Sequence, residues 1–145
     1  MMINSRDIND LHHIVKERCI SFINECGKEN IDVLITSTYR DYESQASLYA
    51  IGRTKQGKKV TNAKPGYSFH NHRVAFDFVP IVNGKAQWND IALITECGEI
   101  AELCGLEWAG HWVTFKELLH CQYTGGLKIA DFLAGKNLDS LNRVS

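Results

Sequence analysis

The chain has 145 residues, of which 44% are hydrophobic and 23% are charged, and its formal net charge at pH 7 is -1. This length and composition predict one globular domain over residues 1–145, with a core of its own. The balanced charge gives no reason to expect nucleic acid as a partner. No stretch approaches the roughly eighteen apolar residues of a membrane span, and we expect no stable membrane association.

The first seven residues lack the basic and apolar segments of a secretory signal, so we expect synthesis and folding in a cytoplasm. Five cysteines cannot all pair with one another, and none of them forms a Cys-x-x-Cys motif. We therefore expect buried, reduced thiols that pack as small apolar residues. The five are Cys19, Cys26, Cys97, Cys104 and Cys121.

Apolar residues recur at steps of three and four over 7–27, which predicts an amphipathic helix with one buried stripe. His12 and His13 lie in this segment, and we expect both to face solvent rather than to act as ligands. The β-branched run at 31–37 predicts a strand that presents Arg40 just beyond its end.

Asp41 is placed to cap a helix that runs to about Ile51. The segment 52–66 after it is rich in glycine and lysine and predicts a loop. This loop is either solvated surface or a mobile flap that brings positive charge toward an anionic substrate. The expected buried residues of the 41–51 helix are Tyr42, Ala46, Tyr49 and Ala50.

The apolar run 74–82 predicts a second strand, and Asn83-Gly84 predicts a tight hairpin to a return strand at 85–88. A second long helix is predicted over 90–105, ended by its glycine. Its expected buried stripe consists of Ile91, Ile94, Cys97, Ile100, Ala101 and Cys104.

The last forty residues predict shorter elements: an edge strand at 106–108, a strand at 118–123, a helix at 128–134 and a fraying tail from 136. The aromatic segment between the two strands supplies candidate wall or rim residues of a cleft, although core packing is an equal alternative for its tryptophans. Helices and antiparallel strands without repeated βαβ units predict an α+β domain. The candidate wall residues are Trp108, His111 and Trp112.

Two polar clusters hold residues that suit a metal centre: His70 and Asp77 in the first, Glu117 and His120 in the second. Two histidines and a carboxylate fit catalytic zinc because three protein ligands leave one tetrahedral position for water. Spacing alone does not exclude another divalent ion. His72 is an alternative to His70, since both face one side of an extended segment. Taken singly, each cluster has a simpler interpretation as ordinary core or surface residues.

The pattern Ser68-x-His70-x-x-x-Val74-Ala75-x-Asp77, followed by Glu117-x-x-His120, resembles the zinc peptidases of the D-alanyl-D-alanine carboxypeptidase type. This family includes VanY-like and VanX-like enzymes and the L-alanyl-D-glutamate endopeptidases of phages. The resemblance extends over most of the chain. Three positions depart from the family pattern: Arg73 replaces a glycine, Leu119 a proline and Cys121 an aromatic residue.

The resemblance implies a small antiparallel sheet with helices packed on it, as in the Hedgehog and DD-peptidase folds. It implies that His70, Asp77 and His120 hold zinc and that Glu117 takes a proton from the attacking water. It also places Arg40 in the active site, to bind substrate or stabilise developing charge. The alternative for Arg40 is a surface ion pair.

Two further residues are expected to bind substrate by resemblance, and each has a structural alternative. Ser68 contacts substrate or caps a turn. Gln45 lines the substrate groove or makes a polar contact in the core. His70 is favoured over His72 as the ligand by the same resemblance.

The function implied is zinc-dependent hydrolysis of the L-alanyl-D-glutamate amide in peptidoglycan stem peptides, by a monomeric phage or prophage endolysin without a separate cell-wall-binding domain. Such an enzyme is made in the host cytoplasm and reaches the wall in the periplasm once the membrane is permeabilised. The alternatives are a D-alanyl-D-alanine carboxypeptidase of the same family and a non-catalytic binding module that contains zinc. Glu117 argues against the binding module, because a structural zinc site needs no additional carboxylate.

Overall fold

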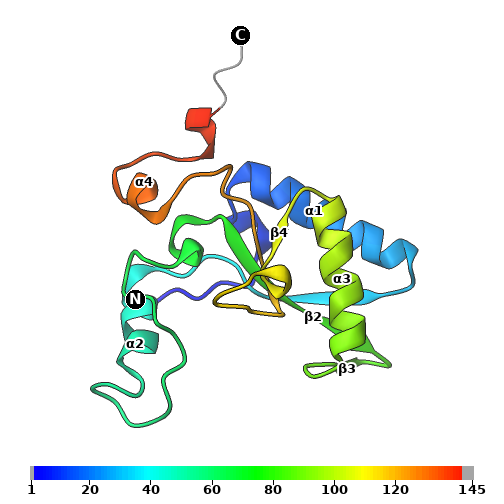
Figure 1. The fold of residues 1–145 in the computed structure, drawn as a ribbon, viewed down its shortest axis with the longest axis horizontal. Helices are drawn as coiled ribbons and strands as arrows, with labels where there is room; N and C mark the ends of the chain where they lie inside the picture. Colours follow the sequence, from blue (N-terminus) through cyan, green and yellow to red (C-terminus); the bar gives the residue numbers. More distant parts are fainter. Residues whose placement is uncertain (1, 142–145) are drawn as a thin grey trace.

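The computed structural model describes residues 2–141 (Figure 1). The α-helices are α1 (His13–Lys28), α2 (Tyr42–Ala50), α3 (Ile91–Leu103) and α4 (Ile129–Leu133). The strands are β1 (Asp32–Ser37), β2 (Ala75–Val82), β3 (Lys85–Ala86), β4 (Glu107–Trp108) and β5 (His120–Gln122). The short 3₁₀ helices are η1 (Ile8–Asp10), η2 (Phe69–His72), η3 (Ala109–His111) and η4 (Leu138–Leu141).

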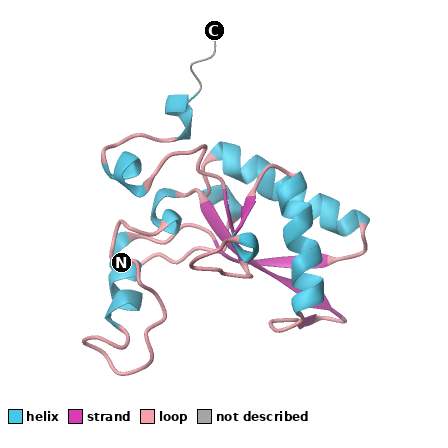
Figure 2. Ribbon diagram, viewed as in Figure 1, coloured by secondary structure: helices cyan, strands magenta, loops and turns pink. Residues whose placement is uncertain are grey.

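One antiparallel sheet forms the centre of the fold, in the order β1-β2-β5-β4, with β3 paired to β2 (Figure 2). This confirms the predicted α+β class and the edge position of β4. The helices α1 and α3 lie together on one side of the sheet (Figure 1). Phe22 of α1 packs there against Phe76 and Phe78 of β2, with ring centroids 5.8 and 5.1 Å apart.

The first helix begins later than predicted. Asp7 caps the short η1, and α1 starts only at His13, with the Nδ1 atom of His12 accepting the Ile14 N–H. The predicted stripe is confirmed as the buried face of α1. The prediction that both histidines face solvent is confirmed for His13, whose side chain is 67% exposed, and is wrong for His12, whose side chain is 13% exposed. The buried residues of α1 are Val15, Cys19, Phe22 and Cys26.

The buried face predicted for α2 is also wrong. Ser44 and Gln45 are the buried residues of this helix, whereas Tyr42 and Ala46 are exposed. The helix packs beside a polar cleft rather than on the apolar core, and Gln45 donates a hydrogen bond to the Ala63 carbonyl. Apolar periodicity therefore does not mark its inner face.

The middle of the chain follows the prediction closely. Asn83 and Gly84 both have positive φ, 51° and 76°, as a tight hairpin between β2 and β3 requires. The return strand is shorter than predicted and ends at Ala86. In α3 the interior residues Ile94, Cys97 and Ala101 are buried, but Ile91 in the first turn is 60% exposed. Its position at the end of the helix leaves it beyond the edge of the core.

The C-terminal part of the described chain is more ordered than predicted. The segment from Lys136 to Leu141 includes η4, and Leu138 in it is buried at 1% exposure, so the predicted fraying does not begin at residue 136. Residues 142–145 of the predicted tail lie outside the described part. All five cysteines are free thiols, and only Cys104 is more than marginally exposed. Within residues 2–141, no helix is both long and apolar enough to cross a membrane.

Candidate metal centre

The register of the sheet brings Asp77 and His120 together. These two residues are directly paired between β2 and β5. Because side chains alternate across a strand, Phe76 and Phe78 enter the core while Asp77 faces the opposite side. Cys121 is likewise buried in the core, where desolvation raises its pKa well above the usual value of a thiol. This placement confirms the predicted buried thiol and keeps Cys121 on the core face of the sheet, away from Asp77 and His120.

His70 is positioned by η2. The hydroxyl of Ser68 caps this 3₁₀ helix by accepting the His70 N–H, and Asn71 completes the capping box. The Asn71 side chain also donates to the Arg40 carbonyl at 2.8 Å, which joins η2 to the end of β1. The local sequence thus fixes the backbone from which the His70 ring extends.

His72 points away from the site. A 3₁₀ helix turns about 120° per residue, so positions 70 and 72 diverge instead of facing one side as in an extended segment. The Nε2 atom of His72 donates to the Gly66 carbonyl at 2.8 Å, and its ring stacks on Phe132 with centroids 5.1 Å apart. The structure therefore brings His70, and not His72, to Asp77.

The three candidate ligands converge on one small space. The Oδ1 atom of Asp77 lies 3.3 Å from Nε2 of His70 and 3.1 Å from Nδ1 of His120. One potential ligand atom of each residue lies within 4.8 Å of the other two. In tetrahedral zinc sites with bonds of about 2.0–2.1 Å, neighbouring ligand atoms are about 3.3 Å apart. The spacing and chemistry of this donor set fit a zinc ion.

Each histidine has its outer nitrogen occupied, which sets the tautomer of the ring. Nδ1 of His70 lies 2.8 Å from the Thr38 carbonyl, which can only accept, so the lone pair is on Nε2. Nε2 of His120 lies 2.8 Å from the side-chain oxygen of Gln122, which leaves the lone pair on Nδ1. Both lone pairs point toward Asp77, as metal ligation requires.

Gln122 is a site residue that the sequence did not indicate. It is buried and lies opposite Glu107 across β4 and β5, and its amide nitrogen is 3.5 Å from the Glu107 carboxylate. That carboxylate is held by the backbone N–H of Thr124 at 3.0 Å. The only sequence signal for Gln122 is a polar residue two positions after His120, on the same strand face.

Opposing electrostatic effects set the charges of the cluster. Burial disfavours ionisation of Asp77, but the neighbouring His120 and His70 outweigh it and hold the pKa of Asp77 well below its usual range. Burial also disfavours the charged form of His120, but Asp77 outweighs that effect and raises the pKa of His120. Asp77 is therefore ionised at neutral pH, as a carboxylate ligand must be.

Arg40 lies in the cleft beside the ligands and is not part of a surface ion pair. Its guanidinium donates to the side-chain oxygen of Gln45 at 3.0 Å and to the Ser37 hydroxyl at 3.3 Å, while its buried Nε has no hydrogen-bond partner among residues 2–141. Burial lowers the pKa of Arg40, and the charges of Asp77 and Glu117 partly offset that effect. The Arg40 guanidinium is thus held by two uncharged side chains, and its Nε–H can still donate a hydrogen bond to a bound ligand.

The remaining predicted residues occupy different places. Glu117 lines the cleft, with its side chain 65% exposed and its carboxylate 3.8 Å from Nδ1 of His120. Ser68 lines the cleft as well as capping η2. Gln45 is fully buried behind Arg40, so the structure places it as a polar contact that supports Arg40 rather than on the cleft wall.

Two segments wall the cleft, which has a volume of about 640 Å³. On one side the end of the 52–66 loop contributes residues 60–63, and on the other Trp112 and Phe115 do so. The Trp112 ring lies edge-on to His120, with centroids 5.9 Å apart. Trp108 is instead a core residue at 2% exposure, and His111 pairs with Glu102, so neither is a cleft wall.

Comparison with known proteins identifies relatives that cover most of the chain. Residues 8–118 match the family described as VanY, D-alanyl-D-alanine carboxypeptidase. The peptidoglycan L-alanyl-D-glutamate endopeptidase CwlK of Bacillus subtilis strain 168 is 36% identical over 129 residues, covering 79% of this chain and 74% of that protein.

Solved structures show the same fold at low sequence identity. The Serratia marcescens L-Ala D-Glu endopeptidase ChiX matches with a TM-score of 0.59 and 18% identity, covering 90% of this chain and 92% of its own. A mutant of the vancomycin resistance D,D-pentapeptidase VanY, in complex with Zn(II), matches with a TM-score of 0.64 and 15% identity, covering 92% and 90%. From the match over residues 8–118 and the identity to CwlK, the chain belongs to the VanY family of peptidases.

Proposed function

We propose that this protein is a zinc-dependent peptidoglycan hydrolase that cleaves the amide between L-alanine and D-glutamate in stem peptides. We choose this bond because the chain is 36% identical to the Bacillus subtilis L-alanyl-D-glutamate endopeptidase. The cleft agrees with such a reaction, because it places a candidate base beside a zinc-type ligand set.

The residues have distinct roles in this proposal. His70 Nε2, Asp77 and His120 Nδ1 hold the metal, which, when bound, lowers the pKa of water from ~16 toward ~7 and polarises a carbonyl. Glu117 takes the proton of the attacking water and returns it to the leaving amine. Its exposure leaves room for both water and substrate on the open side of the cluster.

Arg40 is proposed to bind the attacked carbonyl as negative charge develops on it. The guanidinium is already oriented by Gln45 and Ser37, so little reorganisation accompanies the reaction. Ser68, on the same wall, is proposed as a substrate contact in addition to its capping role.

A D-alanyl-D-alanine carboxypeptidase is the second candidate, because the matching family carries that description. Both reactions would use the same metal, the same base, Glu117, and the same guanidinium, Arg40. They differ in which amide bond the cleft walls place beside these groups. The open cleft, bounded by two loop segments, suits a substrate that continues on both sides of the cleaved bond, and this favours the endopeptidase.

We also propose that the enzyme serves cell lysis and acts on the wall after the membrane is permeabilised. Cells that produce the protein should lyse only when a membrane-permeabilising agent is added, whereas cells that produce Glu117→Ala should survive the same treatment longer. Lysis without the agent would contradict this part of the proposal.

The test of the reaction is mass spectrometry of purified peptidoglycan after digestion. New L-alanine carboxyl ends and D-glutamate amino ends are the expected products. Release of D-alanine alone would move the assignment to the carboxypeptidase. No cleavage by a folded, zinc-loaded protein would favour the binding module.

Glu117→Ala and a chelated sample are the controls for this digestion. Glu117→Ala should remain folded and bind zinc, but its activity should fall by roughly 10²- to 10⁴-fold because the base is missing. A matched variant, Glu99→Gln, changes an exposed glutamate on α3 away from the cleft and should cleave at the normal rate. Substantial activity in Glu117→Ala would remove Glu117 from the role of base.

A further inference from the structure

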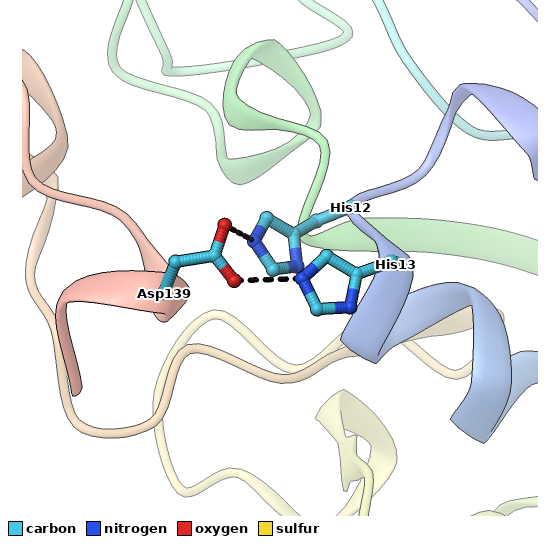
Figure 3. A group of neighbouring side chains, drawn as sticks. All are labelled: His12, His13 and Asp139. Atoms are coloured by element: carbon cyan, nitrogen blue, oxygen red, sulfur yellow. Dashed lines mark hydrogen bonds and ion pairs between the residues drawn. The ribbon is translucent and has the colours of Figure 1, made fainter. Parts of the chain in front are cut away.

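A second group of metal-type ligands lies outside the cleft, where α1 and η4 meet. His12 is the N-cap of α1 and His13 is its first residue, while Asp139 belongs to η4. Figure 3 shows both imidazole rings turned toward the one carboxylate. We propose that these three side chains form a second binding site for a divalent transition metal such as zinc.

The spacing of the ligand atoms supports this proposal. Nε2 of His13 lies 2.7 Å from one carboxylate oxygen of Asp139, and Nε2 of His12 lies 3.2 Å from the other. One ligand atom of each residue falls within 4.8 Å of the other two. Neighbouring ligands of tetrahedral zinc are about 3.3 Å apart, so small side-chain movements would bring the set to bonding distance. Imidazole with carboxylate suits zinc and similar ions.

The His12 ring supplies an independent observation. Its side chain is only 13% exposed, and its Nε2 atom is buried without a hydrogen-bond partner among residues 2–141. The 3.2 Å contact with Asp139 is thus close in distance but not aligned as a hydrogen bond. A buried ring nitrogen left in this state is unfavourable, and a bound metal ion would satisfy it.

The backbone that carries the ligands is held in place before any metal binds. The Arg73 carbonyl accepts the His12 N–H at 2.9 Å, and the Asn137 side chain accepts the Asp139 N–H at 2.8 Å. Leu138, next to Asp139, is buried at 1% exposure and anchors η4 against the body of the protein. The rings of His12 and His13 stack with centroids 4.4 Å apart. Metal binding therefore requires only short movements of the three side chains.

Binding at this site requires the ring proton of His12 to change nitrogen. Its Nδ1 accepts the Ile14 N–H at 3.2 Å, so in the neutral metal-free ring the proton is on Nε2. When a metal takes the Nε2 lone pair, the ring proton moves from Nε2 to Nδ1, which ends the capping hydrogen bond to Ile14. Loss of this capping hydrogen bond opposes metal binding at the second site, whereas His70 and His120 in the cleft already have their outer nitrogens hydrogen-bonded.

A metal ion at this position would join the two ends of the described chain. His12 and His13 precede the first long helix, whereas Asp139 lies in the last helical element. The ion would hold η4 on the start of α1. This site does not depend on the proposed peptidase activity.

The experiment is equilibrium dialysis of the purified full chain against Zn(II), with metal and protein quantified. The wild-type protein should bind two equivalents, and Asp77→Asn, which disables the cleft site, should bind one. His13→Ala and Asp139→Asn should each lose the second equivalent. In Asp77→Asn, Zn(II) should also shift the amide NMR signal of Ile14, because its acceptor is withdrawn.

His111→Ala is the matched control, since His111 is an exposed histidine paired with a glutamate elsewhere, and it should keep both equivalents. The proposal is overturned if the wild-type protein binds a single equivalent, or if His13→Ala and Asp139→Asn still bind two. His13→Ala should cleave peptidoglycan at the wild-type rate. A loss of all cleavage activity in every sample would contradict the peptidase proposal and leave the zinc stoichiometry of the second site unaffected.

Discussion

At the scale of single residues, two neutral acceptors decide which nitrogen of each candidate ligand histidine faces the proposed metal position. The Thr38 carbonyl occupies Nδ1 of His70, and Gln122 occupies Nε2 of His120. His70 is thus prepared to bind through Nε2 and His120 through Nδ1. Partners of this kind commonly contribute 10- to 100-fold to metal affinity.

Gln122→Leu is expected to weaken zinc binding in the cleft by about 10- to 100-fold, because the His120 N–H loses its acceptor. Zinc affinity should be measured by competition with a chromophoric chelator, in the His13→Ala background so that only the cleft site is seen. Glu107→Gln is the control, since it keeps a hydrogen-bond acceptor next to Gln122. Unchanged affinity in Gln122→Leu would show that Gln122 does not orient His120.

Arg73 shows how a side chain compensates for an unfavourable backbone conformation. It stands where the family pattern has glycine, and its φ is +66°, in the left-handed region that costs a side-chain-bearing residue about 1–2 kcal/mol. Its guanidinium donates to the Asp10 carbonyl at 2.8 Å and lies 3.8 Å from the Tyr39 ring centroid. These contacts contribute stability of similar size.

Arg73→Ala should therefore lower the free energy of unfolding by about 1–2 kcal/mol, since the strained backbone stays and the contacts are lost. Arg73→Gly should lie within about 1 kcal/mol of wild type, because it relieves the strain as well. Urea unfolding of the metal-free proteins measures both changes. A glycine variant less stable than the alanine variant would contradict this explanation.

At the scale of elements, α3 and β4 are held together by one close approach. Trp108 of β4 packs against Gly98 of α3, where an added Cβ would overlap the indole ring. The Trp108 N–H also donates to the Leu118 carbonyl at 2.7 Å, which fixes the segment leading to β5. The Trp108 side chain therefore contacts both α3 and the segment that leads into β5, the strand that contains His120.

Gly98→Ala is expected to destabilise the protein by about 1–3 kcal/mol, as overpacking of a filled core does. Gly27→Ala is the matched variant, because Gly27 lies in α1 with no atom within 4 Å of an added Cβ. It should stabilise the protein by about 0.5–1 kcal/mol. Thermal unfolding of the pair tests the prediction, and equal effects would contradict the packing argument.

At the scale of the whole molecule, the core and the cleft lie on opposite faces of one sheet. Phe22, Phe76 and Phe78 pack on the α1 side, whereas Asp77 and His120 face the cleft. The apolar core does not depend on the metal ligands. Removal of metal should therefore leave the fold intact, in contrast to a small zinc-stabilised domain.

Chelation is expected to abolish cleavage while the far-ultraviolet circular dichroism spectrum stays unchanged. Zinc at 100 times its dissociation constant stabilises the folded state by about 2.7 kcal/mol, which corresponds to roughly 10 °C in unfolding temperature. Measurements with His13→Ala would isolate the cleft site from the second site. Loss of the spectrum on chelation would show that the cleft metal is part of the core structure.

The sequence by itself determined the long helical stripe of α1, the Asn83-Gly84 hairpin, the α+β class and the resemblance to zinc peptidases. These features depend on local periodicity, on turn residues with positive φ, and on short motifs, all of which are present in consecutive residues. The inner face of α2 was predicted wrongly, because its buried residue Gln45 is a polar side chain that donates a hydrogen bond to the Ala63 carbonyl and is not part of an apolar stripe.

Only the tertiary structure decided which residues meet across the chain. The choice between His70 and His72 depends on the 3₁₀ turn of η2, and the position of Gln122 depends on the pairing of β4 with β5. Asp139 reaches His12 and His13 only because the burial of Leu138 folds η4 back onto α1. Such contacts follow from packing between distant segments, for which a single sequence carries no local signal.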